Sequence, residues 1–322
     1  MTSPRILILG ANGQIGTELT LALANRYGTE AVATSDLIAE GPIAGVAHHV
    51  LDVTDAEALA DIIGHHGFTQ VYHLAAALSA TGERRPAWAW DLNIRGLLNV
   101  LDLGKARKIE RIFWPSSIAV FGPTTPADTT PQLTATEPVS VYGLSKLAGE
   151  GWCRWYHRNH GVDVRSVRYP GLISWTAAPG GGTTDYAVEI FHAALRDRRY
   201  VCFLKKDQAL PMMYMQDGIR AAIELMDAPA ESVRERGSYN VAAMSFTPEQ
   251  IARAIARHVP EFTIDYAPDY RQEIAASWPR SIDDSFARCD WNWRPQFDLD
   301  STVEIMLRNL RASNPPAAEA RD

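Results

Sequence analysis

The chain has 322 residues, of which 46% are hydrophobic and 21% charged, and its net charge is −7 at pH 7. This length allows one large or two modest domains with a sizeable core, and the acidic balance without basic clusters argues against a nucleic-acid or anionic-membrane partner. Three scattered cysteines without a CxxC spacing predict reduced thiols in a cytoplasmic protein, and no apolar run approaches the roughly 20 residues of a membrane span.

The first half of the chain alternates strand-like and helix-like segments. Several of the strand-like segments are continuous apolar runs, as expected for parallel strands covered on both faces. The candidate strands are residues 5–10, 30–35, 46–51, 70–76, 111–117 and 163–170, and the helical segments lie near 14–27, 55–65, 87–107 and 142–160. This alternation predicts an α/β fold of the Rossmann type, with a doubly wound parallel sheet.

Beyond Gly171 the alternation loosens. The segments with helical periodicity lie near 184–197, 216–227 and 247–258, residues 238–242 resemble a strand, and 268–295 read as irregular structure. We expect residues 1–170 to form the Rossmann domain, with a return segment at about 216–242. Residues 171–215 and 243–312 would then form a smaller substrate-binding lobe, and 313–322 a disordered tail.

The first strand runs into a glycine-rich turn, 10-GANGQIG-16, and a helix follows at once. Such a turn lets a pyrophosphate approach the backbone at the positive end of the helix, although an ordinary strand-to-helix turn can have the same glycines. Asp36 follows the second strand, where a carboxylate accepts hydrogen bonds from ribose hydroxyls and favours NAD over NADP. The residues expected to contact NAD here are Gly10, Asn12, Gly13, Gln14, Ile15, Gly16 and Asp36, with Asp52 and Val53 near the adenine.

Tyr142 and Lys146 in 142-YGLSK-146 are spaced to share one helix face. The pair can be a surface amphipathic pair, but it also fits a general base. A nearby ammonium and an oxidised nicotinamide both favour the phenolate, which would lower the tyrosine pKa from about 10. A hydroxyl that orients the same substrate oxygen would come from Ser116 or Ser117, and only one should face the cofactor because adjacent strand residues point in opposite directions.

Together, the glycine pattern, 73-HLAA-76, Asn93, the serine-then-YxxxK spacing and 168-RYPG-171 resemble the extended short-chain dehydrogenase/reductase family. The resemblance covers essentially the whole chain. It implies that Ser117 is the catalytic serine, that Tyr142 is the base and that Lys146 is its partner. It also implies cofactor contacts from Leu74, Ala75, Ala76, Asn93, Tyr142, Lys146, Tyr169 and Pro170.

Less generic segments are similar to the short-chain, epimerase-like L-threonine 3-dehydrogenases. These segments are residues 77–83, 112–126, 179–187, 210–215, 244–248 and 277–285. The resemblance implies metal-independent oxidation of L-threonine by NAD to 2-amino-3-oxobutyrate, in threonine catabolism. It also implies a substrate contact from Ser79 and a homodimer formed through the helices near 87–107 and 142–160.

The loop 179-PGGGTTDYA-187 offers backbone N–H groups and hydroxyls that can surround a carboxylate without an arginine. Thr184 can instead cap the following helix, and Asp185 can meet an ammonium or favour the helix N-terminus. The expected substrate-binding residues are Ser79, Ser117, Tyr142, Gly181, Gly182, Thr183, Thr184 and Trp278, although Trp278 can equally be a buried structural residue.

Two rival functions stay open on the sequence. A nucleotide-sugar epimerase or dehydratase would share the cofactor and the Ser117, Tyr142 and Lys146 set. A catalytically silent NAD-sensing protein is a second alternative, and the intact set argues against it. The histidines have no ligand spacing, so we expect no metal site.

Overall fold

The computed structural model describes residues 4–176 and 182–313. The predicted contact at Gly181 and all but the first residue of the predicted disordered tail, 313–322, therefore lie outside the described residues, and Ser313 is the last residue of a helix. None of the helices in the described ranges is both long enough and apolar enough to cross a membrane.

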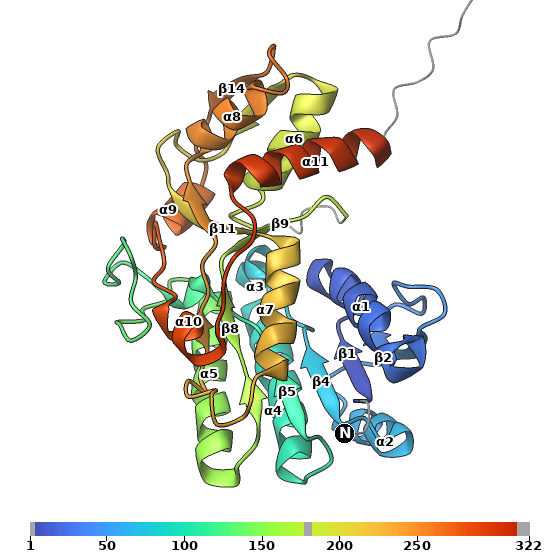
Figure 1. The fold of residues 1–322 in the computed structure, drawn as a ribbon. Helices are drawn as coiled ribbons and strands as arrows, with labels where there is room; N and C mark the ends of the chain where they lie inside the picture. Colours follow the sequence, from blue (N-terminus) through green and yellow to red (C-terminus); the bar gives the residue numbers. More distant parts are fainter. Residues whose placement is uncertain (1–3, 177–181, 314–322) are drawn as a thin grey trace, which may run out of the picture.

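A parallel sheet of six strands forms the centre of the first half (Figure 1). Its order is β3-β2-β1-β4-β5-β7, and every pair in it is parallel. The strands are β1 (Ile6–Leu9), β2 (Val32–Asp36), β3 (Ala47–Val50), β4 (Gln70–His73), β5 (Arg111–Phe113) and β7 (Val164–Arg165). This order confirms the predicted doubly wound α/β fold, in which ligands bind where the strand order reverses, here beside β1.

Helices cover both faces of this sheet. The first face carries α1 (Gln14–Tyr27) and α7 (Met215–Asp227), and the second carries α2 (Ala56–His66), α4 (Pro86–Lys105) and α5 (Val141–His160). Strand β1 shows why both faces are apolar: Ile6 and Ile8 pack with the first set, Leu7 and Leu9 with the second, and all four are fully buried.

Three short strands extend the sheet region toward the site. Strand β6 (Ser116–Ser117) follows β5, β8 (Val167–Tyr169) follows β7, and β12 (Tyr239–Asn240) pairs parallel with β8. In the β6–β8 register, Ser116 lies opposite Arg168 and Ser117 opposite Tyr169. The chain therefore brings the serine segment and the 168-RYPG-171 segment side by side.

The rest of the chain forms a second layer with its own hydrophobic core, seen at the top of Figure 1. One small sheet contains β9 (Gly171–Ile173), β11 (Leu210–Tyr214) and β13 (Met244–Phe246), and β10 (Arg199–Cys202) pairs with β14 (Thr263–Tyr266). Helices α6 (Tyr186–Arg196), α8 (Pro248–Ala256) and α11 (Leu299–Ser313) pack together around this core.

The prediction of irregular structure for residues 268–295 was right only in part. The segment contains the short helices α9 (Arg271–Ala276) and α10 (Ser285–Trp291). Trp291 and Trp293 are buried and pack with Tyr239, so long-range aromatic contacts hold a stretch that lacks helical periodicity. The remaining short helix, α3 (Ser79–Arg84), follows the loop after β4.

Candidate active site

The glycine turn after β1 is packed so tightly that side chains are excluded. Gly10 has φ of +76°, and a Cβ there would lie 2.6 Å from the Ala75 backbone nitrogen. A Cβ on Gly16 would lie 2.6 Å from the carbonyl oxygens of Gly10 and Ala11. Gly13 is different: a Cβ there would meet only the Gly10 oxygen, at 3.4 Å, and the residue lines the main cavity. The turn therefore presents bare backbone to that cavity.

Asp36 lies directly beside this turn. Its carboxylate accepts hydrogen bonds from the backbone N–H groups of Asn12, at 3.0 Å, and Leu37, at 2.8 Å. Leu37 and Ile38 follow it and are 67% and 58% exposed, which leaves two large apolar side chains on the surface next to the carboxylate. Sequence reasoning did not single out Leu37 or Ile38, although apolar residues after such an aspartate were a visible signal.

Asp52 and Val53 have local structural contacts. Asp52 is exposed, and its Oδ1 accepts hydrogen bonds from both the backbone N–H and the hydroxyl of Thr54. Val53 is buried, and its carbonyl accepts a hydrogen bond from the Asn99 side chain of α4. Neither residue lines the main cavity.

The main cavity has a volume of about 390 Å³ and lies between the glycine turn, β6, α5 and the start of α6. The predicted residues that line it are Gly10, Gly13, Gln14, Ile15, Gly16, Leu74, Ala76, Ser79, Ser117, Tyr142, Lys146, Tyr169, Pro170, Gly182, Thr183, Thr184 and Trp278. Ser116 and Asp185, which the sequence offered as alternatives, also line it, and the lining residues that were not predicted are Leu78, Pro115, Ile118, Gly171 and Leu172. Asn12, Asp36, Asp52, Val53, Ala75 and Asn93 do not line it.

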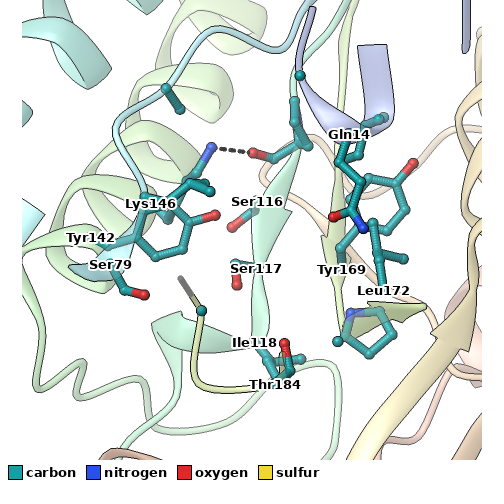
Figure 2. Close-up of a pocket in the computed structure, with 18 of the residues that line it drawn as sticks. Gln14, Ser79, Ser116, Ser117, Ile118, Tyr142, Lys146, Tyr169, Leu172 and Thr184 are labelled. Carbon is teal, nitrogen blue, oxygen red and sulfur yellow. Dashed lines mark hydrogen bonds between the residues drawn. The ribbon is translucent and has the colours of Figure 1, made fainter. Parts of the chain in front are cut away.

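Tyr142, Lys146 and Ser117 meet at one wall of the cavity. In Figure 2 the hydroxyls of Tyr142 and Ser117 face the same space between α5 and β6. Lys146 is 3% exposed, and its Nζ donates a hydrogen bond of 2.7 Å to the Pro115 carbonyl. The same Nζ lies 4.6 Å from the centroid of the Trp114 ring and 5.5 Å from that of Tyr142. The surface-pair interpretation is therefore wrong, because the lysine is buried against the cavity wall.

Burial dominates the electrostatics of this pair. It raises the pKa of Tyr142 to about 12, and a side-chain hydrogen bond with Ser117 acts in the opposite direction. Burial also lowers the pKa of Lys146 to about 7, against the smaller effects of Cys153 and Glu150. The expectation of a lowered tyrosine pKa thus does not hold for the protein alone, because loss of solvation outweighs the hydrogen bond with Ser117.

The two serines of β6 have separate roles. Ser116 is 2% exposed, and its Oγ donates a hydrogen bond of 2.7 Å to the buried carboxylate of Glu150. The Ser117 side chain accepts a bond of 3.2 Å from the Ala119 N–H and interacts with Tyr142. We infer that Ser117 is the serine positioned to share an oxygen with Tyr142.

Asn93 connects two segments beside the cavity. Its amide oxygen accepts the Ala77 N–H at 2.7 Å, and its nitrogen donates to the Ala77 carbonyl and, at 2.9 Å, to the Ser145 hydroxyl. Ser145 in turn donates to the Tyr142 carbonyl. Asn93 therefore joins the loop after β4 to the first turn of α5 rather than facing the cavity.

The opposite wall combines hydroxyls with an aromatic side chain. Thr184 packs against Gly171, where a Cβ would lie 2.8 Å from the Thr184 Cβ. Thr184 does not cap α6: the N-cap residue is Asp185, whose Oδ2 instead accepts the Gly182 N–H at 2.6 Å. Trp278 is 8% exposed and lines the cavity, and its Nε1 is a buried donor without a hydrogen-bond partner among the described residues.

Comparison with known proteins places this arrangement in a family. The sequence model of the NAD dependent epimerase/dehydratase family matches residues 6–242. The chain belongs to this family.

Three relatives illustrate the range of similarity. An uncharacterized epimerase/dehydratase of Staphylococcus haemolyticus is 46% identical over 95% of this chain and 97% of its own length. A GalE-like L-threonine dehydrogenase from Cupriavidus necator, solved in its holo form, is 65% identical with a TM-score of 0.94, covering 95% of this chain and 100% of that one. An L-threonine dehydrogenase from Phytophthora infestans is 49% identical with a TM-score of 0.93, covering 96% and 99%.

The cofactor of this epimerase/dehydratase family member is NAD, and the residues present fit it. The first turn of α1 has no side-chain cap, so its N–H groups are free to face a pyrophosphate. Gly13 leaves space where any larger side chain would enter the cavity. The Asp36 carboxylate stands where a ribose with two free hydroxyls is favoured over one carrying a phosphate.

The described residues contain no group of three or more His, Cys, Asp or Glu side chains suited to hold a metal ion.

Sequence reasoning also missed two residues behind the cavity wall. Trp114 contacts Lys146, and Glu150 contacts Ser116. Glu150 follows Lys146 by four residues on α5, so helical spacing was a signal that could have found it.

Proposed function

We propose that this NAD-dependent oxidoreductase is an L-threonine 3-dehydrogenase, which oxidises the side-chain hydroxyl of L-threonine to give 2-amino-3-oxobutyrate. One observation carries the proposal: Ser117, Tyr142 and Lys146 line the same cavity as Thr183 and Thr184. The high identity to proteins named L-threonine dehydrogenases supports the same substrate.

In the proposed reaction, Tyr142 takes the proton from the threonine hydroxyl while Ser117 donates a hydrogen bond to the same oxygen. When bound at the glycine turn, NAD would supply the hydride acceptor and the positive charge of an oxidised nicotinamide. The buried Lys146 also favours the phenolate when it is protonated, and the Ser117 hydrogen bond acts in the same direction. Burial raises the pKa of Tyr142 to about 12 even with the Ser117 hydrogen bond in place, so the charges of Lys146 and of the nicotinamide would work against that cost.

The remaining groups would hold the two charged ends of the amino acid. Thr183 and Thr184 hydroxyls would bind the carboxylate together with the Trp278 Nε1–H, whose donor capacity is unused among the described residues. Ser79 lies beside the Tyr142 end of the cavity in Figure 2 and would contact the substrate there. We propose residues 171–215 and 243–312 as the lobe that supplies most of these substrate contacts.

A substrate panel tests this function. Purified protein is mixed with NAD and a chelator, and NADH is followed by near-ultraviolet absorbance with L-threonine, L-allo-threonine, L-serine or a UDP-sugar. We expect selective turnover of L-threonine. Interconversion of UDP-sugars, with no NADH formed from L-threonine, would place the chain among the epimerases. The relatives named only as epimerase/dehydratase leave that alternative open.

We also propose a homodimer formed through α4 and α5. Several large apolar side chains on these helices are exposed, and they are Trp88, Trp90, Leu144, Trp152 and Trp155. An exposed apolar face of this kind marks a contact surface in many proteins. Sedimentation velocity should give the mass of a dimer, and Trp152→Glu with Trp155→Glu should shift it to a monomer. A wild-type monomer would overturn this proposal.

A further inference from the structure

A buried ion pair lies directly behind the serines of β6. Glu150 is fully buried, and its Oε1 accepts hydrogen bonds from the Ser116 hydroxyl at 2.7 Å and from Arg168 Nε at 2.8 Å. Its Oε2 accepts a second bond from Arg168, at 2.8 Å, so the two side chains form a bidentate pair. Removing one partner of such a pair leaves an uncompensated buried charge.

The pair joins the elements that carry the reacting groups. Glu150 follows Lys146 by one helical turn and Tyr142 by two, so all three lie along one face of α5. Ser116 is the neighbour of Ser117 on β6, and Arg168 lies opposite Ser116 on β8. The carboxylate is thus the point at which α5, β6 and β8 are held together.

The contacts continue toward the substrate wall. Arg168 Nη1 donates to the Asn240 side-chain oxygen at 3.1 Å and to the Gln132 carbonyl at 3.2 Å. The Asn240 side chain then donates to the Asp283 carbonyl, in the segment that follows Trp278. One network of buried polar contacts therefore reaches from the tyrosine helix to the chain that carries the cavity tryptophan.

We propose that Glu150 is a positioning residue, whose carboxylate fixes the Ser117 hydroxyl relative to Tyr142 and Lys146 through Ser116 and Arg168. The inference rests on the oxidation proposed above, because it concerns the groups that would hold the substrate hydroxyl. A displacement of about 1 Å at such a site can cost about 100-fold in rate. A pair that served stability alone would affect unfolding and leave turnover intact.

The chain supplies a matched control for a purely structural pair. Asp163 accepts hydrogen bonds from Arg165 at 2.9 and 2.8 Å, and Arg165 is fully buried. Asp163 precedes β7, at the amino end of the sheet, and lines no part of the main cavity. Asp163 also pairs with Arg236 and Arg111, so Asp163→Asn disturbs an aspartate bound to three arginines, none of them on α5, β6 or β8.

Two variants disturb the Glu150 network to different degrees. Glu150→Gln keeps a side-chain oxygen but leaves Arg168 uncompensated, whereas Ser116→Ala removes only the hydroxyl bond and leaves the ion pair. We expect kcat with L-threonine to fall about 10-fold or more in Glu150→Gln and several-fold in Ser116→Ala, with the KM for NAD unchanged. Asp163→Asn should lower Tm while each folded molecule keeps the wild-type kcat.

A wild-type kcat in both Glu150→Gln and Ser116→Ala, with only Tm reduced, would overturn the inference. If Glu150→Gln does not fold, the kcat of Ser116→Ala tests the inference by itself. Crystal structures of the wild type and Ser116→Ala give a readout that does not depend on the substrate. A changed position of the Ser117 hydroxyl relative to Tyr142 supports positioning, and an unchanged one contradicts it. Failure of the wild type to oxidise threonine would instead reject the proposed function, and these structures would still test the network.

Discussion

Replacing Lys146 with methionine should abolish turnover and yet stabilise the ligand-free protein near neutral pH. Lys146 is 3% exposed, its Nζ donates a hydrogen bond to the Pro115 carbonyl, and the same Nζ lies over the Trp114 ring. No carboxylate is hydrogen-bonded to it among the described residues. Methionine fills a similar volume without carrying a charge into this apolar surrounding.

The magnitude follows from the pKa of the lysine. Burial lowers this pKa from 10.5 to about 7, so between these values the unfolded chain holds a proton that the folded chain has released. The free energy of unfolding of the wild type therefore rises with pH across this window. The buried charge costs about 4 kcal/mol at pH 7 and less than about 1 kcal/mol at pH 10, since each pH unit is about 1.4 kcal/mol.

Lys146→Met removes this cost but also loses the hydrogen bond to the Pro115 carbonyl and the contact with the Trp114 ring. These losses offset about 2 kcal/mol of the stability gained at pH 7. Urea unfolding of both proteins should then show Lys146→Met more stable by about 2 kcal/mol at pH 7, with the advantage gone by pH 10. Lys108→Met, at an exposed position, is the control and should show no such trend. A stability difference that stays constant between pH 7 and pH 10 would refute the argument that the lysine is a costly buried charge.

Three further substitutions test other parts of the site. Tyr142→Phe should remove nearly all turnover while calorimetry shows NAD binding unchanged, and substantial residual activity would reject the general base. Asp36→Asn should lower the ratio of kcat/KM for NAD to that for NADP by about 10-fold, because it removes the charge that repels a 2′-phosphate. Gly171→Ala should raise the KM for threonine, because its Cβ would clash with the Met212 sulfur and lie 2.8 Å from the Thr184 Cβ, so the segment that carries Thr184 must shift. Gly64→Ala, where a Cβ meets nothing within 4 Å, should instead stabilise α2 by up to about 1 kcal/mol.

Local patterns in the sequence were enough for the fold and for the centre of the site. The glycine turn, the strand before it and helix α1 follow from short-range spacing, and the predicted range 14–27 agrees with α1. The YxxxK spacing placed Tyr142 and Lys146 on one face of α5, where the structure also has them. These features depend on residues that are neighbours in the chain, which is why a single sequence reveals them.

Features that depend on distant contacts were not predictable in the same way. The Glu150–Arg168 pair forms between a helix and a strand, and only the register of β6 with β8 places Ser116 beside it. The direction of the Tyr142 pKa also depends on how deeply the folded chain buries the ring. Asp52 follows β3 by two residues, and its carboxylate accepts hydrogen bonds from Thr54 in a local turn.

The central claim is that Tyr142 takes the hydroxyl proton of L-threonine while hydride leaves the carbon that bears this hydroxyl. Transfer of label tests it most directly: L-threonine deuterated at Cβ is incubated with NAD and the protein, and the reduced cofactor is examined by mass spectrometry. The account predicts reduced cofactor that carries one deuterium, and none when Tyr142→Phe replaces the wild type. Reduced cofactor without deuterium, or no reduction at all, would contradict it.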